Sequence, residues 1–390
     1  MIPLIKNTFY NESESKKKLS DFILESKILS MSTKCREFEK DFSQYNNSKK
    51  SILFNSGGSA NLALIQALKN LGRLKDGDKV GISALTWSTN VMPIIQLGMI
   101  PVAIDIDLST LNIMSSGLKE FIKNETIQAL FITNALGFSG DLDLINQTCN
   151  ENNIILIEDN CESLGTEVGN KKTGTFGVAG THSFYIAHHM STIEGGMVST
   201  DDEELSHMLK IVRANGWDRN LPESEQKKLR KEYQVDSDFN SKYTFYDLGF
   251  NLRPTEITGF LGVQQLKFLN KIVLKRQQNY QFLEKTMLQN QELISIQHDH
   301  INVVSSFSIP VIVKDASLIN KYIAKFEEAE VEIRPIISGD IQKQPFYKKY
   351  VKDFKSLPNA SYIHDNGFYF GNYPELDSSE LEILANCLSA

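Results

Sequence analysis

The sequence predicts an α/β fold, with a mostly parallel sheet in a large N-terminal domain and a smaller C-terminal α+β domain. Three observations lead to this prediction. Short runs rich in β-branched residues alternate with helical stretches from residue 51 onward, which is typical of a parallel sheet covered on both faces. The chain has 390 residues, too many for one simple core. Its 41% apolar and 23% charged residues are typical of a globular protein.

The elements of the large sheet follow in order along the chain. A first strand, Ser51–Asn55, is expected to lead through a glycine turn into a helix over Ala60–Leu71. The further expected strands are Val80–Ser83, Pro101–Asp105, Ala129–Thr133, Ile154–Glu158, Thr181–Tyr185 and Gly196–Thr200. The uncharged stretch from Val80 to Ile104 contains Pro93 and Pro101, which favours strand, loop, helix and strand over a membrane span.

The second half of the chain divides differently. Residues 222–242 are charged and predict an exposed helix or loop, with a lid as one interpretation, and residues 255–284 predict long helical material. We therefore expect a large domain over 1–250, linking helices over 251–289 and a small domain over 290–390. The small domain should hold strands at 305–313 and 331–335 and a helix near 317–329.

Composition excludes several classes of partner. The net charge of -7 and pI near 5.6 argue against nucleic acid, which favours a basic face. The first residues lack the pattern of a signal peptide, so we expect a cytoplasmic protein without a membrane anchor. The four cysteines have no metal-binding spacing, and no metal is expected.

Candidate binding residues follow the predicted strands, where ligand sites of parallel sheets lie. Gly58 and Ser59 stand between a strand and a helix, and glycine amides at a helix start can bind a phosphate, although such a turn is usually only a turn. Asp159 closes another strand, as a ligand group or as a turn former. Trp87 could stack on a ring or belong to the core, and Glu162 lies three residues beyond Asp159.

A histidine follows the strand that ends near Ser183. His188 and His189 are adjacent and precede Glu194-Gly-Gly196. Most lone histidines are structural, but an imidazole can take and give a proton near neutral pH. We therefore assign proton transfer to His188, with His189 as its support.

Together these residues resemble the sugar aminotransferase family of fold type I, pyridoxal-phosphate-dependent enzymes, with the aspartate aminotransferase-like fold. The resemblance is greatest to the histidine-bearing branch, the GDP-4-keto-6-deoxymannose 3-dehydratases. It runs through most of the chain, in Ser56-Gly-Gly-Ser-Ala-Asn-Leu62, Ala84-Leu-Thr-Trp-Ser-Thr89, Glu158-Asp-Asn-Cys-Glu-Ser163, the His188 segment, Gly216-Trp-Asp-Arg-Asn-Leu-Pro222, Gly249-Phe-Asn-Leu-Arg-Pro254, Arg334-Pro-Ile-Ile-Ser-Gly339 and Asn366-Gly-Phe-Tyr-Phe-Gly-Asn372.

The resemblance implies a role for each residue. The large domain would bind pyridoxal 5'-phosphate (PLP) or pyridoxamine 5'-phosphate (PMP). The phosphate would be held by Gly58, Ser59 and Ser183, and by Asn251 from the second chain of a homodimer with shared active sites. The ring would meet Trp87, Asp159 and Glu162. Carboxylates of glutamate would bind Arg219 and Arg253, and Arg334 would meet the nucleotide-sugar.

The resemblance also implies a reaction. Family members hold the cofactor covalently on a lysine five residues after the serine, whereas the fifth residue after Ser183 is His188, which has no primary amine. This implies a C3 dehydratase of a nucleotide-linked 4-keto-6-deoxy sugar, in which glutamate regenerates PMP and yields 2-oxoglutarate. Such an enzyme serves deoxysugar and lipopolysaccharide O-antigen biosynthesis.

Alternatives are a nucleotide-sugar 4-aminotransferase, an iron–sulfur-dependent 3-dehydratase and a catalytically silent PLP-binding relative. The scattered cysteines disfavour the iron–sulfur enzyme. The Gly-Gly-Ser sequence of the turn and the charged stretch after Pro222 depart from the branch pattern. The nucleotide, which could be GDP, CDP or UDP, and the sugar epimer therefore stay open.

Overall fold

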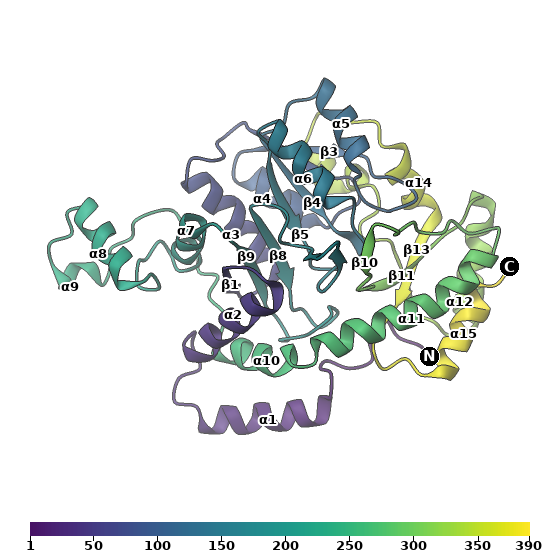
Figure 1. Ribbon diagram of the computed structural model, residues 1–390, viewed down its shortest axis with the longest axis horizontal. Coiled ribbons are helices and arrows are strands. Elements are labelled where there is room, and N and C mark those ends of the chain that lie inside the picture. Colours follow the sequence, from purple (N-terminus) through teal and green to yellow (C-terminus); the bar gives the residue numbers. More distant parts are fainter.

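The computed structural model describes residues 1–390 and confirms the predicted α/β architecture (Figure 1). Seven strands form the large sheet in the order β1-β9-β8-β5-β4-β2-β3. Their bounds are β1 Lys50–Phe54, β2 Lys79–Ser83, β3 Ile100–Ile104, β4 Ala129–Thr133, β5 Ile155–Asp159, β8 Ala179–Ser183 and β9 Gly196–Thr200. Only β9 runs antiparallel to its neighbours, so the sheet is mostly parallel.

Helices cover this sheet and form the outer layers of the molecule (Figure 1). In the first two thirds of the chain they are α1 Glu12–Glu25, α2 Thr33–Asn46, α3 Gly57–Asn70, α4 Ser88–Gln96, α5 Ser115–Asn124, α6 Leu142–Glu151, α7 Glu203–Arg213, α8 Glu223–Glu232, α9 Asp238–Ser241 and α10 Glu256–Leu266. Helix α3 packs on β8, β9 and α7, and α2 packs on β1 and α10.

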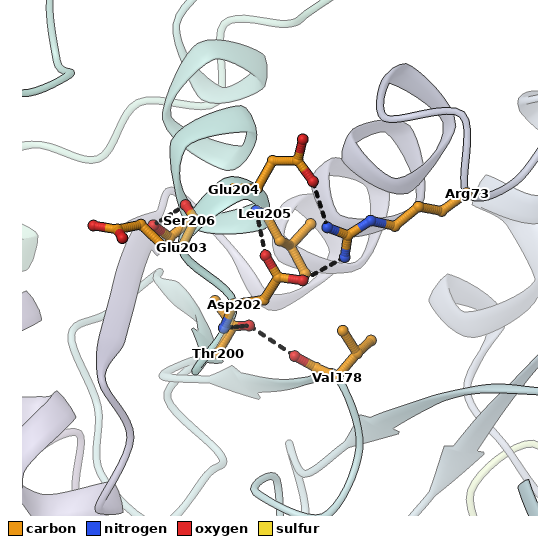
Figure 2. Close-up of polar contacts among 8 residues, drawn as sticks. All are labelled: Arg73, Val178, Thr200, Asp202, Glu203, Glu204, Leu205 and Ser206. Atoms are coloured by element: carbon orange, nitrogen blue, oxygen red, sulfur yellow. Dashed lines mark hydrogen bonds and ion pairs between the residues drawn. The ribbon is translucent and has the colours of Figure 1, made fainter. Parts of the chain in front are cut away.

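Helix α3 begins earlier than expected, because the two glycines form its first turn rather than a separate turn. Ser56 caps the helix, and its Oγ accepts a hydrogen bond from the Ser59 amide at 3.0 Å. The far end of α3 is fixed to α7 by Arg73, which pairs with Asp202 at 2.5 Å and Glu204 at 2.7 Å (Figure 2). These ion pairs fix the C-terminal end of α3 against the start of α7.

The C-terminal part is built on a second, antiparallel sheet in the order β11-β13-β12. Its strands are β11 Ser308–Ile312, β12 Ile333–Pro335 and β13 Gly367–Gly371, and a third small sheet holds β6 Glu167–Val168, β7 Lys171–Lys172 and β10 Ile301–Val303. The remaining helices are α11 Leu269–Gln289, α12 Ile319–Glu328, α13 Pro345–Tyr350, α14 Pro358–Asn366 and α15 Ser378–Leu388.

The predicted linking helices are α10 and α11, and α11 runs from beneath the large sheet to the C-terminal part (Figure 1). One cluster of 71 buried residues includes side chains from both parts, from Ile52 in β1 to Leu388 in α15. At the N-terminus, Ile2 pairs with Val331 beside β12. The division at residues 250 and 290 therefore stays a prediction.

The charged stretch after Pro222 forms α8 and α9, which project from the body of the molecule (Figure 1). Helix α8 has no buried residue, which confirms an exposed helix, and the interpretation as a lid stays a prediction. Its base is anchored where Arg230 pairs with the buried Asp218 at 2.7 Å. None of the helices is both long and apolar enough to cross a membrane.

Candidate functional site

A cavity of about 480 Å³ opens at the carboxyl ends of the parallel strands. Its floor comes from residues at or shortly after the ends of β1, β2, β4, β5 and β8. Its walls come from the segment after β8 and from the C-terminal part. The lining residues are Ser56, Gly57, Gly58, Trp87, Thr89, Asn90, Thr133, Asp159, Cys161, Glu162, Ser183, Tyr185, Ala187, His188, Glu194, Phe307, Ile337 and Tyr369. Six predicted site residues therefore share one cavity: Gly58, Trp87, Asp159, Glu162, Ser183 and His188.

The start of α3 forms a close-fitting cradle beside Ser183. A Cβ atom at Gly57 would lie 2.7 Å from the Cβ of Ser183 and 3.0 Å from its Oγ, so only glycine fits there. At Gly58 a Cβ would lie 3.1 Å from Thr89. The first amides of a helix have no acceptor within it, and here they border the cavity. The cradle therefore suits an anion such as phosphate.

Asp159 is held at the end of β5 by three N–H donors. Its Oδ2 accepts from Asn90 at 2.8 Å and from Asn61 at 3.0 Å, and its Oδ1 accepts from the Cys161 amide at 2.9 Å. A carboxylate has about four acceptor positions, so one remains for a donor in the cavity. Asp159 can therefore receive a protonated ring nitrogen.

His188 lies at the cavity wall in an uncharged state. Burial lowers its pKa to about 4; the nearby Asp159 charge opposes this shift and the Arg276 charge adds to it. The ring packs against Phe307, with centroids 5.3 Å apart. A neutral imidazole at pH 7 has a free lone pair and can accept a proton. No lysine lines the cavity.

His189 is fixed behind this ring. Its Nε2 lies 2.8 Å from the Ser305 carbonyl oxygen, and because a carbonyl only accepts, Nε2 carries the hydrogen. Burial and the charge of Arg276 hold the pKa of His189 well below its usual range. This hydrogen bond fixes the ring of His189, and the role of His189 as a support for His188 stays a prediction.

Glu162 is the second acidic group of the cavity. Burial raises its pKa to about 7; the hydrogen bond from the Leu136 amide, 2.9 Å from Oε2, opposes this shift, and the charge of Asp159 adds to it. The side chain opens only to the cavity and is otherwise enclosed by protein. Burial also raises the pKa of Tyr369 to about 12, and the charge of Glu162 adds to this shift.

Five predicted residues lie outside the cavity of their own chain. Ser59 faces Ser56, with the two hydroxyl oxygens 2.9 Å apart. Arg334 is exposed, yet its charge acts on Tyr369 at the cavity wall.

The other three gather in one patch around Trp217. The guanidinium of Arg219 lies 3.9 Å and that of Arg253 5.9 Å from the Trp217 ring. Asn251 accepts a hydrogen bond from Arg253 at 3.0 Å, and its backbone pairs with Ala214. We call Trp217, Arg219, Asn251 and Arg253 the Trp217 patch.

Several lining residues were not predicted. Asn90 lines the cavity, and Asn61 donates to Asp159 although it is not part of the lining. A strand-end Asp that needs donors was the available signal for both. Phe307 and Tyr369 come from the C-terminal part, and nothing in the local sequence places them at the cavity. Ile337 has φ 48°, rare for a β-branched residue, and its strain at a cavity wall is typical of functional sites.

Residues 11–389 match the DegT/DnrJ/EryC1/StrS aminotransferase family. The chain therefore belongs to this family. The match confirms the resemblance on which the sequence-based roles depend.

Among its relatives are two curated GDP-4-keto-6-deoxy-D-mannose 3-dehydratases. That of Escherichia coli O55:H7 is 36% identical over 374 residues, or 94% of each chain. That of Yersinia pseudotuberculosis is 36% identical over 367 residues, or 92% of this chain and 91% of the relative. A solved structure of GDP-4-keto-6-deoxymannose-3-dehydratase with a trapped PLP-glutamate geminal diamine has a TM-score of 0.91 at 34% identity, covering 100% of both chains.

The residues present fit PLP or PMP. The cradle at Gly57 admits no side chain and borders the amides of α3, as a phosphate needs. Asp159 keeps one acceptor position for a ring nitrogen, and Trp87, 55% exposed, offers an aromatic face at the same cavity. A cofactor here would be held without a covalent bond from position 188.

Proposed function

We propose that this chain is a PLP/PMP-dependent 3-dehydratase of a nucleotide-linked 4-keto-6-deoxy sugar, with glutamate as the co-substrate that regenerates PMP. The observation that carries the proposal is a neutral imidazole, His188, at the cavity wall beside Asp159. Relatives with this printed activity cover more than nine tenths of the chain. We further propose GDP as the nucleotide and lipopolysaccharide O-antigen synthesis in the cytoplasm as the setting.

Bound PMP would supply an amine for the C4 ketone and an electron-withdrawing ring, so that its oxidation to PLP accompanies loss of the C3 hydroxyl. The chain's own residues supply binding and proton transfer. The cradle at Gly57, Gly58 and Ser183 anchors phosphate, and Asp159 accepts the ring N–H. Trp87 covers one face of the ring.

His188 moves the proton. Because burial keeps the imidazole uncharged, it can accept a proton from the cofactor carbon C4′, next to the amine nitrogen. The imidazolium then formed can deliver this proton to the departing C3 hydroxyl, which leaves as water. A first hydrolysis would free the cofactor as PLP and release an unsaturated 4-amino sugar. After protonation at C3, a second hydrolysis at C4 would give ammonia and a 3-deoxy-4-keto sugar. A lysine here would compete for the cofactor as an amine, which would favour a 4-amino sugar.

The decisive experiment uses the purified protein, PMP, glutamate and a panel of GDP-, CDP- and UDP-linked 4-keto-6-deoxy sugars. Mass spectrometry should find a product that has lost one oxygen atom, together with stoichiometric ammonia. A 4-amino sugar that keeps its C3 oxygen would contradict the proposal in favour of the aminotransferase. Cofactor binding without any product would favour the silent relative.

We also propose that two chains share each active site. The Trp217 patch contains the residues expected to bind glutamate and the cofactor phosphate, yet it lies outside the cavity of its own chain. A second copy related by twofold symmetry would bring this patch to the cavity.

Subunit complementation tests the shared site. Mixed dimers of His188→Asn and Asn251→Ala chains should regain about one quarter of wild-type activity, since half of the dimers are hybrids with one intact site. Each variant alone should stay inactive or strongly impaired. Mixtures that regain nothing, although mass analysis shows hybrid dimers, would place both residues in one chain's site.

A further inference from the structure

A buried arginine without a carboxylate partner lies close to His188. Arg276 in α11 is 3% exposed and forms no salt bridge. Its Nη1 donates to the carbonyl oxygens of Phe307 at 2.7 Å and Ser306 at 3.4 Å, and to that of Asn372. Buried arginines are usually paired with an anion, because an unpaired charge is costly to desolvate. Burial indeed lowers the pKa of Arg276 to about 10, and the charge of Glu375, which borders the same small cavity, opposes this shift.

Two of the carbonyl groups that accept hydrogen bonds from Arg276 belong to the segment 305–307, which contacts both histidines. The Phe307 ring lies 5.3 Å from the His188 ring and 6.1 Å from the His189 ring. The neighbouring Ser305 carbonyl accepts the hydrogen bond from His189. The segment 305–307 is thus bonded to Arg276 and packed against His188.

A small cavity also borders these groups. It has a volume of about 30 Å³, and its lining includes His188, His189, Arg276, Glu375 and the N-terminal residues 7–10. Such a volume holds about one water molecule. The guanidinium and the two imidazoles therefore border one small space.

We propose that Arg276 is a positioning residue for His188, which fixes the segment 305–307 against the imidazole and disfavours a second positive charge on that ring. This inference rests on the proposed role of His188 as the base. The lowered pKa values of His188 and His189 agree with it, since the charge of Arg276 contributes to both.

The titratable or charged side chains around His188 come from several elements. They are Asp159 at the end of β5, Cys161 and Glu162 beyond it, Tyr185, His189 and Glu194 in the segment after β8, Tyr10 near the N-terminus, Arg276 in α11, Tyr369 in β13, and Tyr373 and Glu375 after β13. Only Arg276 among them carries a permanent positive charge, so its replacement isolates that contribution.

The test compares Arg276→Gln, which keeps an N–H donor but no charge, with Arg276→Lys, which keeps the charge. Histidine-selective NMR of the cofactor-free protein follows the His188 ring, assigned by its loss in His188→Asn. The pKa of His188 should rise by about one unit in the Gln variant and stay within about 0.3 unit in the Lys variant. Equal His188 titration in wild type and in a folded Gln variant would overturn the proposal.

Kinetics provide the second readout. Neither variant places a guanidinium nitrogen where Nη1 donates to three carbonyls, so kcat should fall about tenfold while KM for the sugar nucleotide changes less than about twofold. Arg213→Lys is the matched control, because Arg213 is equally buried but paired with Glu39. An equal loss of kcat in the control would overturn the positioning role. The NMR result stands apart from turnover, so an inactive wild type would count against the proposed function alone.

Discussion

Replacing Gly57 by alanine tests the phosphate cradle. The added Cβ would lie 2.7 Å from the Cβ of Ser183, about 0.7 Å inside ordinary van der Waals contact. Both residues are buried where their elements meet, since Gly57 opens α3 and Ser183 ends β8. The first turn of α3 must therefore move away from Ser183, which misaligns the amides that face the cavity.

The expected cost follows from this displacement. Overpacking by one methyl group costs about 1–3 kcal/mol. Because the cofactor-free chain can relax but the bound chain needs the original cradle, most of this cost falls on binding. The dissociation constant of PMP should therefore rise by about 10- to 100-fold, as measured by fluorescence titration. The thermal midpoint of the cofactor-free protein should fall by only a few degrees.

A double-mutant cycle decides whether the clash is the cause. Ser183→Gly removes the opposing Cβ, so adding Gly57→Ala to this variant should change PMP affinity little. Gly117→Ala is the control, because a Cβ at that position in α5 meets nothing within 4 Å. Wild-type PMP affinity in a folded Gly57→Ala variant would refute the cradle. So would an equal loss of PMP affinity when Gly57→Ala is added to wild type and to Ser183→Gly.

Three further predictions concern the cavity and its histidines. His188→Asn should lower ammonia release by a factor of about 10² to 10⁴ and leave PMP affinity within about threefold, because no covalent bond is lost; a large fall in affinity would contradict this. Asn90→Ala removes one of three donors to Asp159 and should lower kcat about tenfold, with wild-type kcat as the contrary result. Burial lowers the pKa of His182 to about 3 from 6.5, so the unfolded chain binds more protons between these values and stability falls as pH drops below 6.5. Urea unfolding at pH 7 and pH 5 should show that the free energy of unfolding falls by about 2 kcal/mol through His182 alone. His182→Phe places an apolar ring beside Phe42 and should remove that part of the pH dependence.

The strands of the large sheet could be predicted because they are short, buried and β-branched. The predicted bounds of Ala129–Thr133 and Gly196–Thr200 are those of β4 and β9. In a parallel sheet the carboxyl ends meet at one edge, so Asp159 and Ser183 could be expected in one site. The predicted start of α3 at Ala60 was wrong because glycine favours turns by local preference, whereas the cap at Ser56 starts the helix at Gly57.

Other parts left no local signal. Helix α1 has a single fully buried residue, Ser15, so it lacks the apolar stripe by which an amphipathic helix is identified. Arg276 lies in a long helix and its sequence context is that of an exposed cation. Its burial follows from contacts with Phe307 and Asn372, 31 and 96 residues away, which only the packing of the C-terminal part creates.

The position of the Trp217 patch also left no local signal, because its residues lie outside the cavity of the same chain. The resemblance implies Arg219 and Arg253 in an active site, and both lie at the ring of Trp217. That ring stacks on Phe245, which is 54% exposed. The cavity in turn exposes the large aromatic ring of Trp87. Apolar side chains so open to water at two separate places are typical of surfaces that meet in an assembly. One twofold contact would cover both surfaces and bring two cationic side chains to a cavity whose own charged groups are Asp159, Glu162 and Glu194, where a dicarboxylate such as glutamate needs them.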